Sequence, residues 1–139
     1  AAKKLESIGA EGVLICADVM HKAASEVAAA VDVPISHIVN DIGSKLKANR
    51  IHKVGPLATR AVIESDFYRK PLEERFQVDV FAPEPEETEW VNYIIFEELG
   101  KGIVKEGSQE KLLKMIERLG QNGAEAYVLA CPDLAPLLR

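Results

Sequence analysis

Cys131 is the residue of this sequence that is best placed to do chemistry, because it directly follows the short apolar stretch 126–130. Such a stretch is typical of a buried strand, and in an open parallel sheet ligands bind at the carboxyl ends of the strands. A thiol at that position can act as a nucleophile or transfer protons when its pKa is lowered. One or two residues earlier it would be a small core side chain, and free cysteines are often buried. The spacing therefore leaves a chemical and a structural role open for Cys131.

Two further apolar stretches end in side chains with polar groups. Residues 12–17 lead into Asp18 and His21, and residues 53–58 lead into Thr59. If these stretches are parallel strands, their carboxyl ends meet at one edge of the sheet and bring the three polar groups toward the thiol. We therefore expect a site at this edge, although a position on a helix surface explains His21 equally well.

Elements of regular structure must hold these residues in place. Apolar runs separated by turn residues predict strands near residues 12–17, 34–39, 53–58, 77–81 and 125–131. Helical periodicity and capping residues predict helices near residues 1–8, 20–31, 40–48, 60–75, 86–99 and 108–119. This alternation predicts an α/β fold, a flavodoxin-like three-layer sandwich around a five-stranded, mainly parallel sheet. With 139 residues, 47% of them apolar, residues 1–139 have the size of a single domain.

Composition excludes several classes of protein. The net charge is -5 and no basic stripe marks a nucleic-acid surface. No stretch approaches the roughly 20 apolar residues of a membrane span, and no signal peptide opens the sequence. Cys16 and Cys131 both lie within apolar runs, which indicates reduced thiols in a cytoplasmic protein, and no Cys/His cluster has the spacing of a zinc site. We therefore expect no metal, no nucleic acid and no membrane as partners.

The three strand ends, taken together, resemble the motifs of a known family. Asp18-Val19-Met20-His21 corresponds to the family motif Asn-Thr-Met-His, and Leu57-Ala58-Thr59-Arg60 corresponds to the motif Leu-Gly-Thr-Arg. Ala130-Cys131-Pro132-Asp133 corresponds to the motif Gly-Cys-Thr-Glu. On these motifs the chain resembles the aspartate/glutamate racemase family, especially its aspartate-racemase branch. The resemblance covers nearly every residue, including Asp66-Phe67-Tyr68, Glu97-Glu98-Leu99 and Asn122-Gly123-Ala124.

The resemblance implies an isomerase that inverts an acidic amino acid without pyridoxal phosphate or any other cofactor. Two opposed thiol or hydroxyl groups would remove the α-proton from one face and return a proton on the other. The resemblance places the second group on Cys131 and the first on Ala17, which carries no proton to transfer. Cys16 is one residue away, and because a one-residue shift along a strand turns the side chain to the opposite face, we expect it to be buried there. The resemblance also implies that Thr59, Asp18 and His21 match the positions that surround the substrate in the family's enzymes.

Several residues depart from the family's pattern. Asp18 and Val19 replace an Asn and a Thr, and Pro132 replaces the Thr after the cysteine, so hydrogen-bond donors are lost and negative charge is added. An acidic substrate would be repelled by that charge. By the same resemblance, we expect residues 1–139 to lack the opening strand and helix of the family's first lobe and the segment that returns to that lobe.

Two functions from different classes therefore remain open. The first is an impaired, PLP-independent racemase that acts on a small acidic amino acid through Cys131. The second is a non-enzymatic folded module, a natural remnant or an engineered chain, without a substrate. A homodimer that exchanges elements to complete the sheet is compatible with both.

Overall fold

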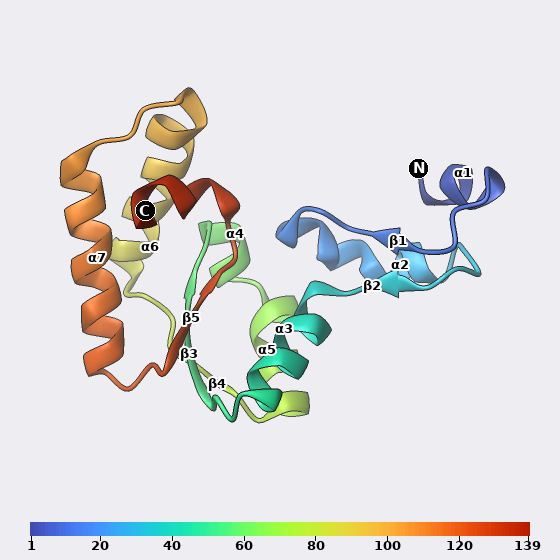
Figure 1. Ribbon diagram of the computed structural model, residues 1–139, viewed down its shortest axis with the longest axis horizontal. Coiled ribbons are helices and arrows are strands. Elements are labelled where there is room, and N and C mark those ends of the chain that lie inside the picture. The colour runs from blue at the N-terminus through green and yellow to red at the C-terminus, as the bar shows by residue number, and fades with distance from the viewer.

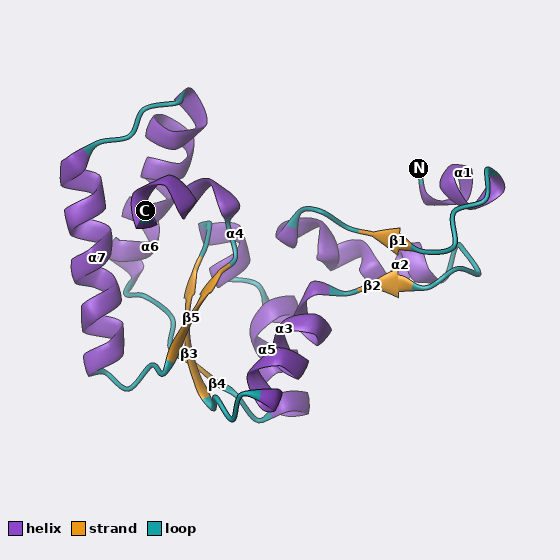
Figure 2. Cartoon of the chain, in the orientation of Figure 1, coloured by secondary structure: helices purple, strands orange, loops and turns teal.

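The computed structural model describes all residues 1–139 and has parallel strands with helices on both sides, as the sequence predicts for an α/β protein (Figure 2). Its central sheet has three parallel strands in the order β4-β3-β5. They are β3 (Lys53–Leu57), β4 (Asp79–Val80) and β5 (Ala126–Leu129). Along β3 and β5, Val54 lies opposite Ala126 and Leu57 opposite Leu129. β3 and β5 thus end at the same edge of the sheet, whereas β4 ends earlier, opposite Val54.

Helices cover both faces of this sheet (Figure 1). On one face α3 (Ile38–Ala48), α4 (Arg60–Ile63) and α5 (Asp66–Phe76) pack in a cluster that includes Val54. On the other face α6 (Pro85–Tyr93), α7 (Glu106–Gln121) and the final 3-10 helix η4 (Pro132–Leu138) pack in a cluster that includes Leu57. Because successive strand residues point to opposite faces, the two β3 residues contribute to different cores.

Residues 1–36 form an arm that projects away from the rest of the molecule, the body (residues 38–139), as Figure 1 shows. The arm contains α1 (Ala2–Ser7), β1 (Val13–Leu14), the 3-10 helix η1 (Asp18–Ala23), α2 (Ala24–Ala28) and β2 (Ile35–Ser36). β1 and β2 pair in parallel and form a separate two-stranded sheet. His21 and Ala24 are the only arm residues that are buried. The arm therefore has almost no core of its own.

The prediction of one five-stranded sheet is wrong, because the strands are divided between a two-stranded and a three-stranded sheet. The strand predicted at residues 34–39 ends at Ser36. His37 instead caps α3, since its Nδ1 accepts a hydrogen bond from the Val39 N–H at 3.3 Å. The helix predicted at residues 20–31 is also wrong in detail, because a 3-10 helix begins already at Asp18 and α2 ends at Ala28.

Two predicted helices are interrupted. The helix expected at residues 60–75 is divided into α4 and α5 at Ser65, whose hydroxyl donates to the Ala61 carbonyl. The helix expected at residues 86–99 passes from α6 into a π-helical turn η2 (Ile94–Glu98) and a 3-10 turn η3 (Leu99–Lys101). None of the helices is both long enough and apolar enough to cross a bilayer.

The π-helical turn brings a carboxylate into the interior. Glu98 is only 5% exposed, and its two oxygens accept hydrogen bonds from Lys105 Nζ at 2.8 Å and Ser108 Oγ at 2.6 Å. These contacts lower the pKa of the Glu98 carboxyl. The hydrogen bond from Lys105 has the largest effect, and the hydrogen bond from Ser108 adds to it. The paired charge ties the end of η2 to the start of α7.

Pro56 lies inside the central strand, where a residue without a backbone N–H is normally excluded. The register explains why it is tolerated. Val54 directs its carbonyl to the β4 side, where it accepts from the Phe81 N–H at 2.8 Å. Pro56, two residues later, faces the same side. β4 ends at Val80, so no strand bond is lost there.

Candidate active site

A cavity of about 220 Å³ lies where the chain leaves β3 and β5 and where residues 16–19 of the arm meet the body. Its lining comes from three segments that are far apart in the sequence. They are Cys16, Ala17, Asp18 and Val19, then Thr59 and Val62, then Ala130, Cys131, Pro132 and Asp133. The structure therefore brings together three of the four residues predicted for the site, namely Asp18, Thr59 and Cys131.

Cys131 lies just beyond the end of β5 and is 7% exposed. Its Sγ is 3.8 Å from Asp133 Oδ2, and its side chain also packs in the α6–α7 core. Burial raises the pKa of the Cys131 thiol, and the carboxylates of Asp133 and Asp18 raise it further, although the Asp133 N–H opposes them. The thiol is therefore held in its protonated form near neutral pH.

Cys16 differs from the prediction, which placed it buried on the far side of its strand. It is exposed and lines the same cavity as Cys131. The reason is that β1 ends at Leu14, so Cys16 lies beyond the paired part of the strand and the alternation of faces does not fix its direction. Its Sγ faces the Leu14 carbonyl at 4.0 Å rather than the opposite wall of the cavity.

Thr59 and Asp18 supply polar groups to the cavity. Thr59 precedes α4 in the N-cap position, yet its side chain makes no capping hydrogen bond. Asp18 is half-buried, and burial raises the pKa of its carboxyl, with His21 acting in the opposite direction. Thr59 and Asp18 thus line the same small cavity as Cys131.

His21 lies behind the cavity rather than in its lining. It is 3% exposed, and its Nδ1 lies 3.2 Å from the Ala17 carbonyl, to which it can donate. Its Nε2 has no hydrogen-bond partner, and its ring centroid is 5.0 Å from that of His37. The contact with Ala17 suits His21 to position the residues before Asp18, a different role from the substrate contact that the resemblance implies.

Sequence reasoning did not single out Tyr68 or Asp133. The Tyr68 hydroxyl is buried without a partner, and burial together with the Asp18 carboxylate raises its pKa. Asp133 contacts the thiol directly. A signal for both existed, since Tyr68 is in the Asp-Phe-Tyr match and Asp133 is the last residue of the cysteine motif.

The charge of the lining decides what the cavity can bind. Two of its side chains are carboxylic acids and none is cationic. An anionic ligand would be repelled, because like charges in a partly desolvated space oppose each other strongly. No group of three His, Cys, Asp or Glu side chains is arranged to hold a metal ion. The chemistry open to this site is therefore that of a thiol beside carboxyl groups.

The whole chain matches one family model, described as Asp/Glu/Hydantoin racemase, over residues 1–139. This chain belongs to that family. It is similar to a proposed Asp/Glu racemase from Yersinia pestis, with 34% identity and a TM-score of 0.94. It is also similar to an aspartate racemase homologue from Pyrococcus horikoshii OT3, with 34% identity and a TM-score of 0.88. The resemblance drawn from the motifs is thereby confirmed.

A third structure, an aspartate racemase from Picrophilus torridus, shares the fold with this chain at 19% identity and a TM-score of 0.75. In all three comparisons 99% of this racemase-family chain is covered. It spans only 60% of the length of the first two relatives and 56% of the third.

Proposed function

We propose that this chain is a catalytically impaired racemase-family domain in which Cys131 is the remaining acid/base group for an α-proton of a small acidic amino acid. The observation that carries the proposal is the cavity lining, in which the Cys131 thiol faces carboxylic acids, the methyl group of Ala17 and no cation. The cytoplasmic setting that keeps both thiols reduced belongs to the same proposal.

Removing an α-proton requires a base, and the structure keeps most of this base in its protonated form. A thiolate is the reactive form of cysteine, and burial and two carboxylates raise the pKa of Cys131. Inversion also requires a second group on the other face of the α-carbon, and general acid–base groups typically contribute about 10²- to 10⁴-fold each. Ala17 offers none. The expected chemistry is therefore one-sided. The small thiolate fraction of Cys131 takes the α-proton, the resulting S–H exchanges with solvent, and a solvent-derived proton returns to the same face of the α-carbon.

Cys16 is the other thiol that lines the cavity, so its position must be considered first when a second acid/base group is sought. It is exposed to solvent and directed toward its own strand at Leu14. Its thiol contacts the Leu14 carbonyl rather than a carboxylate or a hydroxyl, so Cys16 stays a solvent-facing thiol in this proposal.

A second candidate function, a non-enzymatic folded module, is favoured by the apolar part of the lining. Ala17, Val19, Val62 and Pro132 all line the cavity, and by the family resemblance Ala17, Val19 and Pro132 replace side chains that could hydrogen-bond a ligand. Buried polar groups cost free energy when they have no partner, so apolar residues stabilise a cavity that is not filled.

The two candidates are separated by proton–deuterium exchange at the α-carbon. L- and D-aspartate and L- and D-glutamate are incubated in D₂O with the 139-residue chain, and NMR and chiral chromatography follow exchange and inversion. Exchange without inversion, lost in Cys131→Ala and kept in the matched variant Cys16→Ala, is the expected result of one-sided transfer.

The other outcomes also decide between the proposals. Absence of exchange with all four amino acids, from a protein shown to be folded, supports the non-enzymatic module. Inversion at a rate comparable to exchange would overturn the proposal of an impaired site. If Cys16→Ala also abolished that inversion, Cys16 would be the second acid/base group.

A further inference from the structure

The arm joins the body through a single residue, His37, which lies between β2 and α3. Close to this joint, the 3-10 helix η1 of the arm lies beside α4 of the body (Figure 1). The ring centroid of His21 on η1 is 5.0 Å from that of His37, and the two ring planes are inclined by 59°. Two imidazoles therefore meet where the arm is attached, and neither belongs to the lining of the cavity at Cys131.

His37 holds the first turn of α3 through a lone pair on its ring. Its Nδ1 accepts a hydrogen bond from the Val39 N–H at 3.3 Å, so the side chain caps the helix. An imidazole can accept at Nδ1 only while that nitrogen carries no proton. Protonation replaces the acceptor by an N–H group and places a cation at the positive end of the helix dipole. The capping contact therefore requires neutral His37.

The charges around His37 also favour its neutral form. His21 faces it from the arm, and Arg75 faces it from α5. The Arg75 guanidinium donates to Asn40 Oδ1 at 2.8 Å, which holds the cation at the first turn of α3. Burial lowers the pKa of the His37 imidazole most, and His21 and Arg75 lower it further, whereas Asp41 of α3 and a backbone hydrogen bond oppose them.

His21 connects this joint to the wall of the cavity. Its Nδ1 lies 3.2 Å from the carbonyl of Ala17, and Ala17 lines the cavity together with its neighbours in the arm. Its Nε2 is buried without a hydrogen-bond partner, so the carbonyl and the packing against His37 hold the ring. The charged group that faces His21 from η1 itself is the Asp18 carboxyl. His37, His21 and residues 16–19 thus form one connected path from the joint to the cavity.

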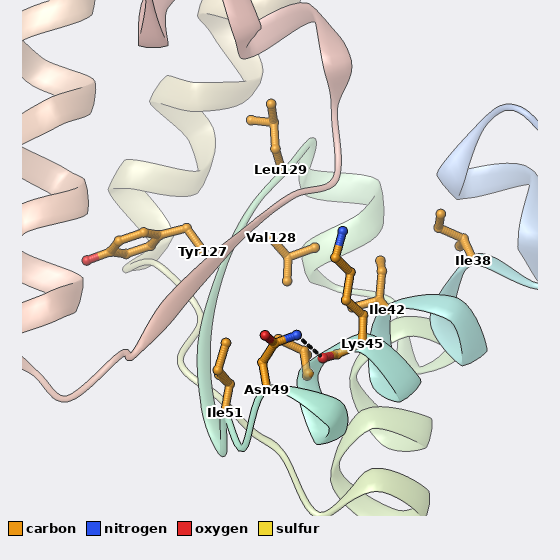
Figure 3. Close-up of a pocket in the computed structure, with 9 residues that line it drawn as sticks. Ile38, Ile42, Lys45, Asn49, Ile51, Tyr127, Val128 and Leu129 are labelled. Atoms are coloured by element: carbon orange, nitrogen blue, oxygen red, sulfur yellow. Dashed lines mark hydrogen bonds between the residues drawn. The ribbon is translucent and has the colours of Figure 1, made fainter.

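The rest of α3 is anchored independently of the arm. Val39 is fully buried in the same core cluster as Val54 of β3, and Ile42 packs against this cluster. Figure 3 shows Ile38 at the start of the helix, farther from β5 than Ile42, which lies near Val128. Loss of the His37 contact therefore frees the joint, while the core still holds the helix on the sheet.

We propose that neutral His37 is a latch that holds the arm wall of the cavity against the body, and that protonation of His37 in mild acid releases the arm. A released His37 has the ordinary histidine pKa of about 6.5, and the closed state lowers this pKa. The stabilisation of the closed state is therefore complete above about pH 6.5 and is lost as the pH falls through the lower pKa of the closed state. The latch concerns closure of the cavity and does not depend on whether the cavity has catalytic activity.

Amide hydrogen exchange of the arm, measured from about pH 7.5 to about pH 5 and corrected for intrinsic exchange rates, tests the latch. The N–H groups of Met20 and Ala24 donate to carbonyls at the two ends of η1, which has little core of its own. Their protection therefore depends on the contact of η1 with the body. It should fall about fivefold in acid, the loss expected when one N-cap hydrogen bond is removed. Protection of β3 and β5 should not change.

Three variants identify the group that titrates. His37→Asn keeps an acceptor at the N-cap but has no proton that titrates, so arm protection should become independent of pH. His37→Ala removes the acceptor, so arm protection should be low over the whole pH range. His52→Asn is the matched control, because His52 is exposed before β3 and its replacement should leave the pH dependence intact.

NMR titration of the histidine Cε1–H signals assigns the transition to a residue, and circular dichroism confirms that each variant is folded. The midpoint of the loss in arm protection should coincide with the titration of His37. Arm protection that does not change with pH, a pH dependence that persists in His37→Asn, or a midpoint that follows His21 would each overturn the latch. A simultaneous loss of protection in β3 and β5 would also overturn it, because the whole molecule would then be unfolding. None of these outcomes uses amino-acid turnover, so a failure of the latch is distinct from a failure of the proposed function.

Discussion

Replacing Asp133 by asparagine should make the Cys131 thiol more reactive. Asp133 Oδ2 lies 3.8 Å from Cys131 Sγ, and this carboxylate raises the pKa of the thiol. Asparagine keeps the shape of the side chain and also keeps the backbone N–H of residue 133, which lowers that pKa. The substitution therefore removes the unfavourable charge and leaves the favourable hydrogen bond.

The size of the effect follows from the separation of the two charges. Unit charges about 4 Å apart interact by about 1 kcal/mol in bulk water, and this value is a lower bound here because Asp133 is exposed but Cys131 is buried. One kcal/mol corresponds to about a fivefold change in the thiolate fraction below the pKa of the thiol. A thiolate of lower pKa is intrinsically less nucleophilic, with a Brønsted coefficient of about 0.4–0.5, so the net gain in alkylation rate is roughly two- to threefold.

The assay is iodoacetamide alkylation as a function of pH, followed by mass spectrometry. The background is Cys16→Ser, so that Cys131 is the only thiol. Asp79→Asn in β4 makes the same charge change far from the thiol and serves as the control. An inflection that stays in place or moves to higher pH in Asp133→Asn would refute the assignment of this carboxylate as a cause of the raised pKa.

Three further predictions concern labelling and stability. In the native protein a thiol reagent should modify the exposed Cys16 before the buried Cys131, as peptide mapping at short times will show; the reverse order would contradict the placement of residue 16. Gly43→Ala should lower the urea-derived unfolding free energy by about 1–3 kcal/mol, because the added Cβ overlaps the Phe76 ring and the overlap outweighs the better helix propensity of alanine. Glu98 has a lowered pKa, so its contribution to stability is complete above the unfolded-state value of about 4.3 and disappears as the pH falls through the folded-state pKa. Glu98→Gln should therefore flatten the loss of stability in acid, and equal slopes for the two proteins would exclude Glu98 as a contributor.

The sequence predicts the layers of this fold because strand and helix patterns are local. β3 and β5 occur where apolar runs placed them, within two residues at each end. Which strands share a sheet depends on pairing between distant segments, and no local pattern contains that information. The prediction for residues 34–39 failed for a local reason, since the His37 ring caps a helix that begins one residue later.

The site was predictable to the extent that strand ends determine it. Thr59 and Cys131 follow strands whose pairing extends almost to their ends, so their meeting at one edge follows from parallel topology. Cys16 follows a strand of only two residues, and two unpaired positions were enough to reverse the expected direction of its side chain. His21 was placed near the site by the motif, but only the structure shows that a backbone carbonyl, rather than the cavity, is its partner.

Because few side chains of the arm are buried, opening of the arm limits the lifetime of the cavity. The arm supplies two of the 29 buried residues, and a segment with so little core opens by local unfolding at a free energy well below that of the whole molecule. One wall of the cavity, formed by residues 16–19, belongs to this segment, whereas Thr59 and Cys131 belong to the sheet. Backbone amides of the arm should therefore exchange with solvent much faster than those of β3 and β5. The cavity exists only while the arm is closed, so the population of a binding-competent site is set by the opening equilibrium of the arm rather than by the stability of the sheet.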